Sequence, residues 1–281
     1  MKKMIVRLSG GLGNQLFQYS LARSMSHKVD KDVYIGASSY FRDRKRHYDL
    51  NGYKLKIKRA PLWLDFFCEF MFLLLGKFAI SSKLVSKEDG WFKYDANIFE
   101  TEAIYLCGCW QNLNYFEDIR DELKEEIILT SKMTDEQLLI KKLVREKESV
   151  AVHIRRGDYL EALTSQIYET QSLDYYTDAI NDIRSKVTNP LFCVFSDDIE
   201  WCKEHFKHLD DVVFPGQISA GDALVEFELM KNCHHFIISN STFSWWASWL
   251  GKNDDSIIIY PQKWFKDSSD NELCRDALFH S

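Results

Sequence analysis

Two arginines and an aspartate follow a short apolar segment in the middle of the chain. The stretch 150–160 reads VAVHIRRGDYL, in which Arg155, Arg156 and Asp158 come after the apolar residues. A guanidinium group is always charged, and its forked N–H donors match two phosphate oxygens at once. We therefore expect Arg155 and Arg156 to hold a diphosphate and to stabilise the negative charge that develops as a bond to phosphate breaks. In the alternative interpretation, one arginine pairs with Asp158 and the other is solvated.

Two roles suit Asp158 at this position. It could orient an arginine, or it could accept a proton from an attacking hydroxyl group. A carboxylate beside two guanidinium groups has a lowered pKa and is a weak base, which favours the orienting role. His153 is the other candidate base, but its place inside an apolar strand is more typical of a buried structural histidine.

A second polar group stands at 239–246, where the sequence reads SNSTFSWW. Hydroxyl and amide groups at the start of a predicted helix come from Ser239, Asn240, Ser241 and Thr242, and the free N–H groups of the helix also favour a phosphate. The alternative is a well-capped helix without a ligand. We interpret the tryptophans of this helix as packing residues rather than as platforms for a sugar, and they are Trp245, Trp246 and Trp249.

A glycine-rich stretch, GGLGNQ at 10–15, connects a predicted strand to a helix expected at 14–28. It is neither a P-loop nor a G-x-G-x-x-G fingerprint. A glycine turn lets the backbone approach a ligand closely. We therefore expect Gly11, Asn14 and Gln15 to lie at a cleft between two lobes, with Asn14 also capping the helix.

Metal-binding patterns are weak in this sequence. Asp30 and Asp32 have the D-x-D spacing used by metal-dependent sugar transferases, but a lysine separates them and their neighbours are basic. His205 and His208 lack a third ligand at a useful spacing. Because two arginines can neutralise a phosphate, we expect that no metal ion and no other cofactor is required.

An alternation of short apolar strands with helices positions these groups. From residue 149 onward each continuously apolar strand is followed by a helix, which predicts a parallel sheet covered on both faces. Strands are expected at 149–154, 191–196, 211–214, 234–239 and 256–260, and helices near 174–187, 198–207, 221–233 and 241–250. The carboxyl ends of parallel strands meet at one edge of the sheet, where ligands bind. The arginines, Asp197 and the SNSTF segment should therefore converge.

The beginning of the chain predicts another α/β unit, with strands at 4–8 and 32–38 on either side of its helix. A charged stretch near 130–149 separates this unit from the later strands. We therefore expect an N-terminal lobe at 1–148 and a C-terminal lobe at 149–281. The fold class is α/β, with two facing Rossmann-like lobes and a parallel sheet in the C-terminal lobe.

Composition describes a globular protein whose charge is unevenly distributed. The net charge is −6, yet residues 1–60 carry 14 Lys/Arg against 4 Asp/Glu. A basic end serves an anionic ligand, an anionic membrane surface or only solvent. Nucleic acid is disfavoured by the negative net charge and by the lack of a basic-aromatic motif. Seven scattered cysteines favour reduced thiols in the cytoplasm, and the start of the chain lacks the apolar core of a signal peptide.

The segment 61–80, PLWLDFFCEFMFLLLGKFAI, has the length of a membrane span, but Asp65 and Glu69 interrupt it. A mostly buried helix is the favoured interpretation. The second is a helix that lies in a membrane interface beside the basic region 42–59. A transmembrane helix is the least favoured of the three.

Six motifs along the chain resemble those of one protein family. In order they are LSGGLGNQLFQYSLARSMS, CWQNLNYF, VAVHIRRGDY, SLDYYTDAI, VFSDDIEWC and ISNSTFSWWASWL. Over about residues 4–265 the chain is similar to the bacterial α-1,2-fucosyltransferases of glycosyltransferase family 11, most weakly across 38–105. This resemblance implies the GT-B fold, with an acceptor-side N-terminal lobe and a donor-binding C-terminal lobe. It also implies GDP-fucose as donor, no required metal, and an inverting transfer that gives Fuc-α1,2-Gal.

The resemblance also implies roles for individual residues. Arg155 would contact the β-phosphate and stabilise the GDP leaving group, and Arg156 would support the same region. Asp158 and Asp197 would orient the arginines or face the guanosine. Donor contacts after the fourth strand of the C-terminal lobe would come from Asn240, Ser241, Thr242 and Phe243, while Asn14 would reach across from the first lobe.

The acceptor is the part that the sequence leaves open. The resemblance implies a galactose-terminated glycan, either a surface or O-antigen repeat on a lipid carrier or a free galactoside. A lipid-linked acceptor would explain the apolar segment 61–80 and a peripheral location on the inner face of the membrane. The alternatives are a fucosyltransferase of another linkage in the same superfamily and a non-catalytic protein that binds nucleotide sugars or glycans.

Overall fold

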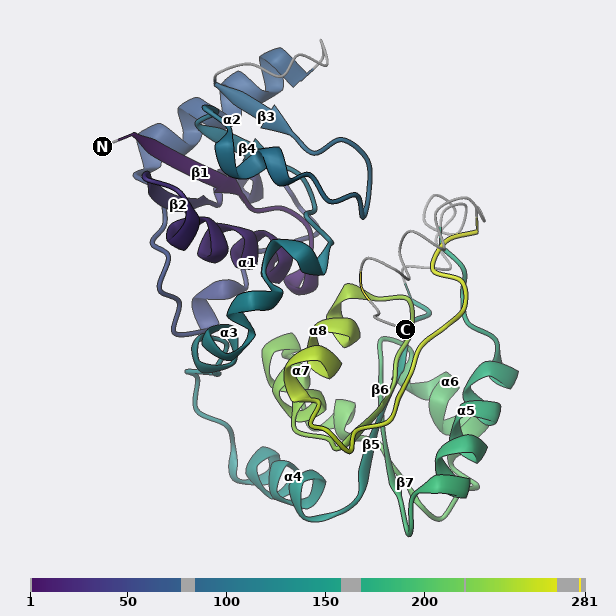
Figure 1. The fold of residues 1–281 in the computed structure, drawn as a ribbon. Coiled ribbons are helices and arrows are strands. Elements are labelled where there is room, and N and C mark those ends of the chain that lie inside the picture. The colour runs from purple at the N-terminus through teal and green to yellow at the C-terminus, as the bar shows by residue number, and fades with distance from the viewer. Residues whose placement is uncertain (1, 77–83, 158–167, 220, 267–277, 279–281) are drawn as a thin grey trace. The chain divides into compact units, whose positions relative to one another are not determined.

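The computed structural model describes residues 2–76, 84–157, 168–219, 221–266 and 278, which form two compact α/β units (Figure 1). Of the described residues, those up to 128 together with 278 form the N-terminal unit, and those from 129 to 266 form the C-terminal unit. Each unit contains its own sheet and its own buried core.

The N-terminal unit is built on a parallel sheet of four strands, in the order β2-β1-β4-β3. The strands are β1 (Lys3–Arg7), β2 (Asp32–Gly36), β3 (Val85–Lys87) and β4 (Tyr105–Cys107). The helices are α1 (Leu12–Lys28), α2 (Leu62–Gly76) and α3 (Arg120–Glu126). Short 3₁₀ turns lie at Ser38–Phe41, Leu50–Gly52, Ala96–Glu100, Leu113–Tyr115 and Glu117–Ile119.

Helices α1 and α2 lie on opposite sides of this sheet (Figure 1). Successive strand residues face opposite sides, and Ile5 and Tyr105 pack with Cys68 of α2 in one buried cluster. The predicted apolar face of α1 is fully buried, as shown by Leu16 and Phe17. Burial of apolar side chains on both faces makes this a covered parallel sheet, as expected.

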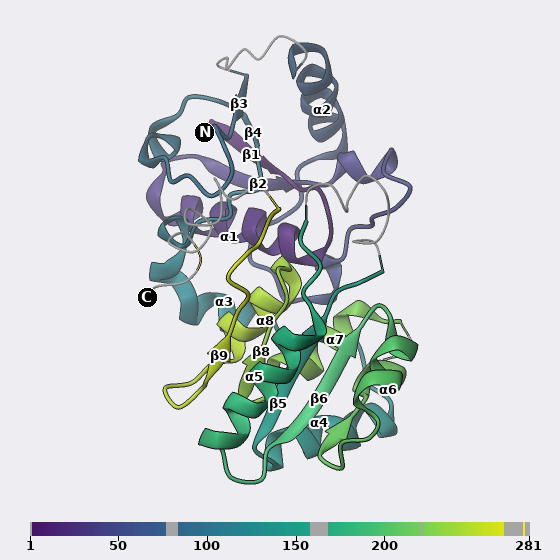
Figure 2. The same ribbon diagram turned by 90° about the vertical axis from the view of Figure 1, so that its right-hand side faces the viewer.

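The C-terminal unit has a parallel sheet of five strands in the order β7-β6-β5-β8-β9, four of which are labelled side by side in Figure 2. The strands are β5 (Ser149–Ile154), β6 (Leu191–Ser196), β7 (Val212–Val213), β8 (His235–Ile237) and β9 (Ile258–Ile259). The helices are α4 (Asp135–Glu146), α5 (Leu173–Lys186), α6 (Ile199–Phe206), α7 (Ala223–Lys231) and α8 (Thr242–Gly251), with a 3₁₀ turn at Pro215–Gln217. Each strand and helix predicted from 149 onward is therefore confirmed.

The core of this unit explains why the alternation of strands and helices could be predicted from the sequence. The side chains of β5 alternate between two layers, and Val150, Val152 and Ile154 pack against α5 and α6. On helix α8 the three tryptophans are buried, which confirms their interpretation as packing residues. Gly251 ends this helix against α7, where a Cβ atom would lie 2.3 Å from the carbonyl oxygen of Lys231. Only glycine permits that approach.

The boundary between the units lies at 128–129 rather than at the predicted 148–149. The charged stretch that suggested the later boundary is largely the exposed face of helix α4. Its inner face binds the C-terminal unit, since Lys141 Nζ lies 2.7 Å from Glu228 Oε1 and Gln137 Nε2 donates to the carbonyl of Ile218 at 3.2 Å. Helix α4 therefore folds as part of the second unit.

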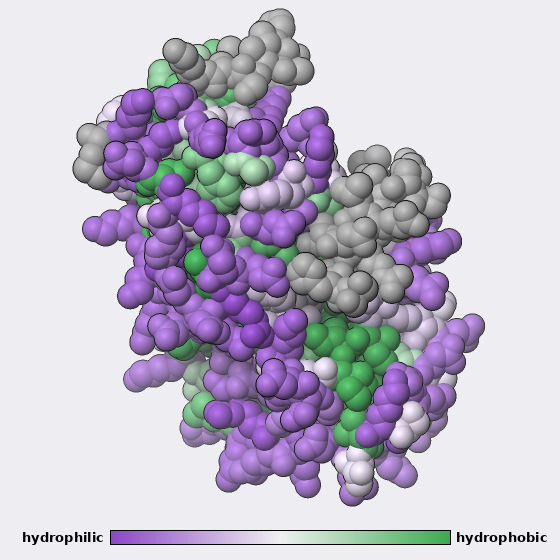
Figure 3. Space-filling model, in the orientation of Figure 1, coloured by the Kyte–Doolittle hydropathy of each residue, from purple (hydrophilic) through white to green (hydrophobic). Residues whose placement is uncertain are grey.

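Helix α2 differs from the favoured prediction of a mostly buried helix. Both of its acids, Asp65 and Glu69, are buried, whereas several of its aromatic residues are exposed. No helix among the described residues is long and apolar enough to cross a membrane. The face of the protein drawn in Figure 3 is mostly hydrophilic, in keeping with a content of 28% charged residues, and its largest apolar patch lies over the C-terminal unit.

Candidate active site

The candidate site lies at the carboxyl edge of the C-terminal sheet. From β5 the chain runs outward to β6 and β7, and it then returns to place β8 on the other side of β5. Ligands of open α/β sheets bind outside the strand ends at such a reversal. The turn with Arg155 follows β5, and the turn with Asn240 and Ser241 follows β8. The topology therefore brings the two predicted anion-binding segments together.

Arg155 is oriented by Asp197, and the strand register explains why. Ile154 pairs with Ser196, so the next residues of the two strands are neighbours. Arg155 Nε lies 3.2 Å from Asp197 Oδ2. The other oxygen, Oδ1, accepts hydrogen bonds from the backbone N–H groups of Arg156 at 2.8 Å and Gly157 at 3.0 Å. One carboxylate thus fixes both the turn and the direction of the guanidinium group.

Arg156 is held by helix α6 instead. Its Nε lies 3.5 Å from Asp198 Oδ2, and its Cζ lies 4.1 Å from the centroid of the Trp201 ring, which is a cation–π contact. The arginines are therefore paired with two consecutive aspartates, 197 and 198. In the alternative interpretation, one of the two arginines pairs with Asp158. This residue lies outside the described residues, so the roles proposed for it stay predictions.

His153 is a structural residue in this arrangement. Its ring is almost completely buried, and its Nδ1 lies 2.9 Å from the hydroxyl of Ser239. Burial, together with the charge of Arg155, lowers the pKa of His153 to about 3. A base with that pKa takes up protons poorly at neutral pH. The interpretation of His153 as a buried core histidine is therefore supported.

The SNSTF segment forms the start of helix α8 beside the end of β8. Ser241 is the N-cap, and its hydroxyl accepts a hydrogen bond from the N–H of Phe243. Thr242 and Phe243 are partly exposed, and the Phe243 ring packs against His153 with centroids 5.8 Å apart. The N-terminus of α8, with its positive end of the helix dipole, thus lies at the predicted position.

Asn240 has a structural role besides the predicted donor contact, which stays a prediction. Its side-chain amide is buried and donates to the carbonyls of Glu169 at 2.9 Å and Trp264 at 2.7 Å. The amide nitrogen therefore ties the segments around 169 and 264 to the end of β8. It supports the site from within the unit.

Glu226 joins the site although nothing in the sequence analysis singled it out. It lies in the first turn of α7, and its carboxyl group interacts electrostatically with Asp197 and Arg155. Burial raises the pKa of Glu226 to about 7, and the Asp197 carboxylate adds to the rise, whereas Arg155 opposes it. In sequence Glu226 is only an acid in the first turn of a helix, a common helix-stabilising feature. Its nearness to the arginine depends on the packing of α7.

The glycine-rich turn of the N-terminal unit is held mainly by its own side chains. Gly10 has a φ of +77°, and a Cβ atom there would lie 2.6 Å from Asn14 Nδ2, so the turn requires glycine. Gly11, not Asn14, is the N-cap of α1. Asn14 Oδ1 accepts from Gln111 Nε2 at 3.0 Å. Gln15 is fully buried, and its amide donates to the carbonyls of residues 10 and 47. Gln15 thus links parts of the N-terminal unit by hydrogen bonds, and its buried side chain is not exposed to a ligand.

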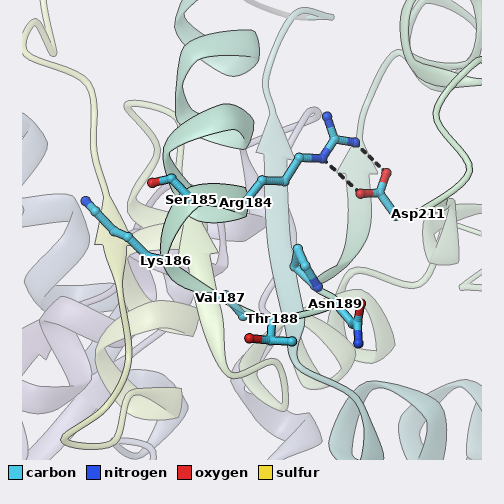
Figure 4. A pocket seen from close by; sticks show the side chains of 8 residues that line it. Arg184, Ser185, Lys186, Val187, Thr188, Asn189 and Asp211 are labelled. Atoms are coloured by element: carbon cyan, nitrogen blue, oxygen red, sulfur yellow. Dashed lines mark hydrogen bonds and ion pairs between the residues drawn. The ribbon is translucent and has the colours of Figure 1, made fainter.

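Two of the hollows formed by the described residues lie away from the arginine pair. One, of about 350 Å³, follows strand β3 in the N-terminal unit and is lined by acidic and aromatic residues that include Glu88, Tyr94 and Trp110. The other lies beside Arg184 and Asp211, which are paired through Nη2 and Oδ1 at 2.6 Å (Figure 4). This second hollow adjoins the amino ends of β6 and β7, opposite the candidate site.

Within the described parts of the chain, no group of three or more His, Cys, Asp or Glu side chains is arranged to hold a metal ion. Asp32 begins strand β2 at the amino end of the N-terminal sheet. The cysteines described are free: Cys68, Cys107, Cys109, Cys193, Cys202 and Cys233.

Two α/β units with parallel sheets, one of which carries arginines and a helix N-terminus at the reversal of its strand order, define a GT-B protein. A solved structure of POFUT1 in complex with GDP-fucose is similar, with a TM-score of 0.53 at 13% identity, covering 92% of this chain and 98% of that one. At this identity the similarity shows the fold alone, and it confirms the predicted fold class.

A sequence model of glycosyl transferase family 11 matches residues 83–279. The chain belongs to this family, and it is therefore a glycosyltransferase. An α-1,2-colitosyltransferase of Escherichia coli is 34% identical over 95% of this chain and 93% of its own length. A galactoside α-(1,2)-fucosyltransferase 1 of Rattus norvegicus is 29% identical over 58% of this chain and 46% of its own length.

Proposed function

We propose that the protein transfers L-fucose from GDP-fucose to the 2-hydroxyl of a galactose, with inversion, to give Fuc-α1,2-Gal. The observation that carries this proposal is the Arg155–Asp197 pair at the strand reversal, beside the N-terminus of α8. Family 11 membership supports glycosyl transfer, and the name of the rat relative supports both the sugar and the linkage.

The reaction is a direct displacement at the anomeric carbon of fucose. The bond from this carbon to the β-phosphate oxygen breaks, and the bond to the galactose 2-oxygen forms on the opposite face. The electron pair of the broken bond leaves with GDP, and the hydroxyl proton passes to a base or to water. Arg155 stabilises the charge that develops on the departing diphosphate. Asp158 is the proposed base or a further orienting residue.

The acceptor is proposed to be a galactose-terminated glycan, and the hollow beside Asp89 and the exposed ring of Tyr94 is its proposed place in the N-terminal unit. Aromatic rings pack against the apolar faces of sugars, and carboxylates accept hydrogen bonds from sugar hydroxyls. The hollow combines both kinds of group.

A second candidate function is colitosyl transfer, favoured by the 34% identity with the colitosyltransferase. Colitose is L-fucose without its 3-hydroxyl group, so the two donors differ by one polar group. A site that hydrogen-bonds this hydroxyl rejects the deoxy sugar strongly, whereas an apolar pocket discriminates weakly. The ratio of kcat/KM for GDP-fucose and GDP-colitose therefore decides between them.

The proposed function is tested by incubating the purified protein with GDP-fucose and a panel of β-galactosides in the presence of EDTA. The expected product is Fuc-α1,2-Gal, with its linkage assigned by NMR and with no loss of rate on chelation. Transfer to another hydroxyl would overturn the linkage, and activity that returns only with added Mg²⁺ or Mn²⁺ would overturn metal independence. A lack of GDP-fucose binding would overturn the proposal as a whole.

Replacing Glu226 by glutamine is expected to weaken the binding of GDP by about tenfold or more at pH ~8. Guanine offers two adjacent donors, N1–H and the 2-amino group, and a carboxylate accepts from both at once, whereas an amide does not. Hydrogen bonds to charged groups contribute about 1.5–3 kcal/mol each. Asp197 and Asp198 are already paired with Arg155 and Arg156 and accept backbone hydrogen bonds, so we assign the contact with guanine to Glu226.

The pH dependence follows from the pKa of Glu226, which is raised to about 7. The ionised form is the acceptor, so the ratio of Kd values between the Glu226→Gln variant and the wild type should grow as the pH rises from about 6 to about 8. The ratio cancels the ionisation of GDP itself. Glu200→Gln, which changes another first-turn acid of the same unit, is the matched control. A constant ratio near one would contradict the assignment.

A further inference from the structure

Helix α2 is turned with its acids inward. Asp65 accepts hydrogen bonds through Oδ2 from the N–H groups of Ala37 at 2.8 Å and Ser38 at 2.9 Å. Glu69 Oε2 accepts hydrogen bonds from Arg7 Nε at 2.7 Å and from the hydroxyl of Tyr105 at 2.9 Å. These bonds satisfy both carboxylates and fix the rotation of the helix about its axis.

The opposite side of α2 presents apolar side chains to solvent. Six residues of the helix are between 43% and 70% exposed, namely Leu62, Trp63, Phe66, Phe67, Phe70 and Leu74. At the α-helical turn of about 100° per residue they occupy one continuous arc of about 140°. Phe41 is 68% exposed and extends this arc, with its ring centroid 5.0 Å from that of Phe66. We call these seven residues the α2 apolar face.

The size of this face is unusual for a soluble surface. Its five aromatic residues alone expose roughly 600 Å², if a whole aromatic side chain contributes ~200 Å². The largest apolar patch of a typical monomer covers about 300–600 Å², and larger patches mark interaction sites. Burying two carboxylates costs free energy, whereas a helix with its aromatic side chains inward would bury none. The outward orientation of the aromatic side chains is therefore a specific property of this fold.

A strongly basic segment lies next to the α2 apolar face. Residues 42–59 contain eight Lys/Arg against two Asp, and all eight basic residues are exposed. At one end of this segment Arg42 Nη2 lies 3.5 Å from Glu69 Oε1, and the other end precedes α2 by two residues. The two ends of the basic segment are therefore close to α2, and Arg42 directly follows Phe41 of the α2 apolar face.

We propose that the α2 apolar face and the basic segment 42–59 together dock the protein onto an anionic phospholipid bilayer. Tryptophan and phenylalanine insert at the boundary between headgroups and acyl chains, while neighbouring Lys and Arg bind anionic headgroups. A second copy of the chain fits less well, because a symmetric dimer through this face would bring two basic segments together. The proposal concerns a surface of the N-terminal unit and does not depend on the proposed function.

The test is flotation of the full-length protein with vesicles of phosphatidylcholine alone or of phosphatidylcholine and phosphatidylglycerol in equal parts. We expect binding to the mixed vesicles only, falling at least tenfold in the Phe66→Gln/Phe70→Gln variant and in the Arg44→Glu/Lys58→Glu variant. Each variant has a control in the C-terminal unit, where Leu139 and Lys207 are exposed. The controls Leu139→Gln and Lys207→Glu should float like the wild type.

Two further readouts keep the test independent of folding and of catalysis. The tryptophan emission of the wild type should shift to shorter wavelength on mixed vesicles, and the shift should be smaller in the Trp63→Phe variant. All variants should retain the wild-type far-ultraviolet circular dichroism and the wild-type activity toward a soluble acceptor. Equal binding to both kinds of vesicle would overturn the role of the basic segment. A dimer in solution that the Phe66→Gln/Phe70→Gln change dissociates, without vesicle binding, would overturn the bilayer as the partner.

Discussion

Replacing Arg155 by alanine is expected to lower kcat by about 10²-fold or more, with a smaller change in the Kd of GDP-fucose. The reason is the position of the guanidinium group at the strand reversal, where Asp197 Oδ2 holds its Nε at 3.2 Å. Charge on the diphosphate grows as the glycosidic bond breaks, so the interaction is stronger in the transition state than in the ground state. Single-turnover kinetics with saturating donor separate the two effects.

The matched control for this prediction is Arg184→Ala. Arg184 forms an equally direct ion pair with Asp211, at 2.6 Å, but at the opposite edge of the same sheet (Figure 4). Its removal should leave kcat unchanged. Arg155→Lys should recover only part of the rate, because an ammonium group keeps the positive charge but lacks the paired N–H donors that bind two phosphate oxygens at once. A wild-type kcat in Arg155→Ala would show that the leaving group is stabilised elsewhere.

The C-terminal unit was predictable because its sequence pattern and its topology agree. Short apolar strands followed by helices define a parallel sheet, and the ends of such strands meet at one edge whatever the lengths of the connections. The sequence could therefore bring Arg155, Asp197 and Ser241 together without any knowledge of distances. The register of β5 and β6 then decides that Arg155 meets Asp197.

The remaining features depend on contacts that no local pattern contains. Asn240 and Gln15 are polar residues in glycine- or serine-rich turns, yet their amides bind carbonyls of their own unit. Glu226 comes within electrostatic range of Arg155 only through the packing of α7. Helix α2 was expected to be mostly buried because it is apolar, but the partners that draw Asp65 and Glu69 inward lie about 30 and 60 residues earlier in the chain.

Replacing Glu69 by glutamine is expected to destabilise the protein by about 3–5 kcal/mol, because the change leaves the Arg7 charge without its partner in a buried place. Glu69 binds both Nε and Nη2 of Arg7, at 2.7 and 3.0 Å, and accepts from Tyr105 as well. The exposed i,i+4 pair of Lys142 and Glu146, 3.7 Å apart, offers the control Glu146→Gln. That change should cost about 0.5 kcal/mol or less. Urea unfolding followed by tryptophan fluorescence measures both.

The pH dependence of stability provides a second check on the same pair. Burial alone would raise the pKa of Glu69, but the hydrogen bonds and charge of Arg7 outweigh it and the pKa is lowered. A lowered pKa in the folded state means that stability is present above the unfolded pKa of about 4.5 and is lost as the pH falls through the folded value. The difference in unfolding free energy between wild type and Glu69→Gln should therefore shrink below pH ~4.5. Replacing both partners by leucine should restore most of the stability, because an apolar pair leaves no buried charge. If the single variant were as stable as the wild type at neutral pH, Glu69 would not be what holds the aromatic side of α2 outward.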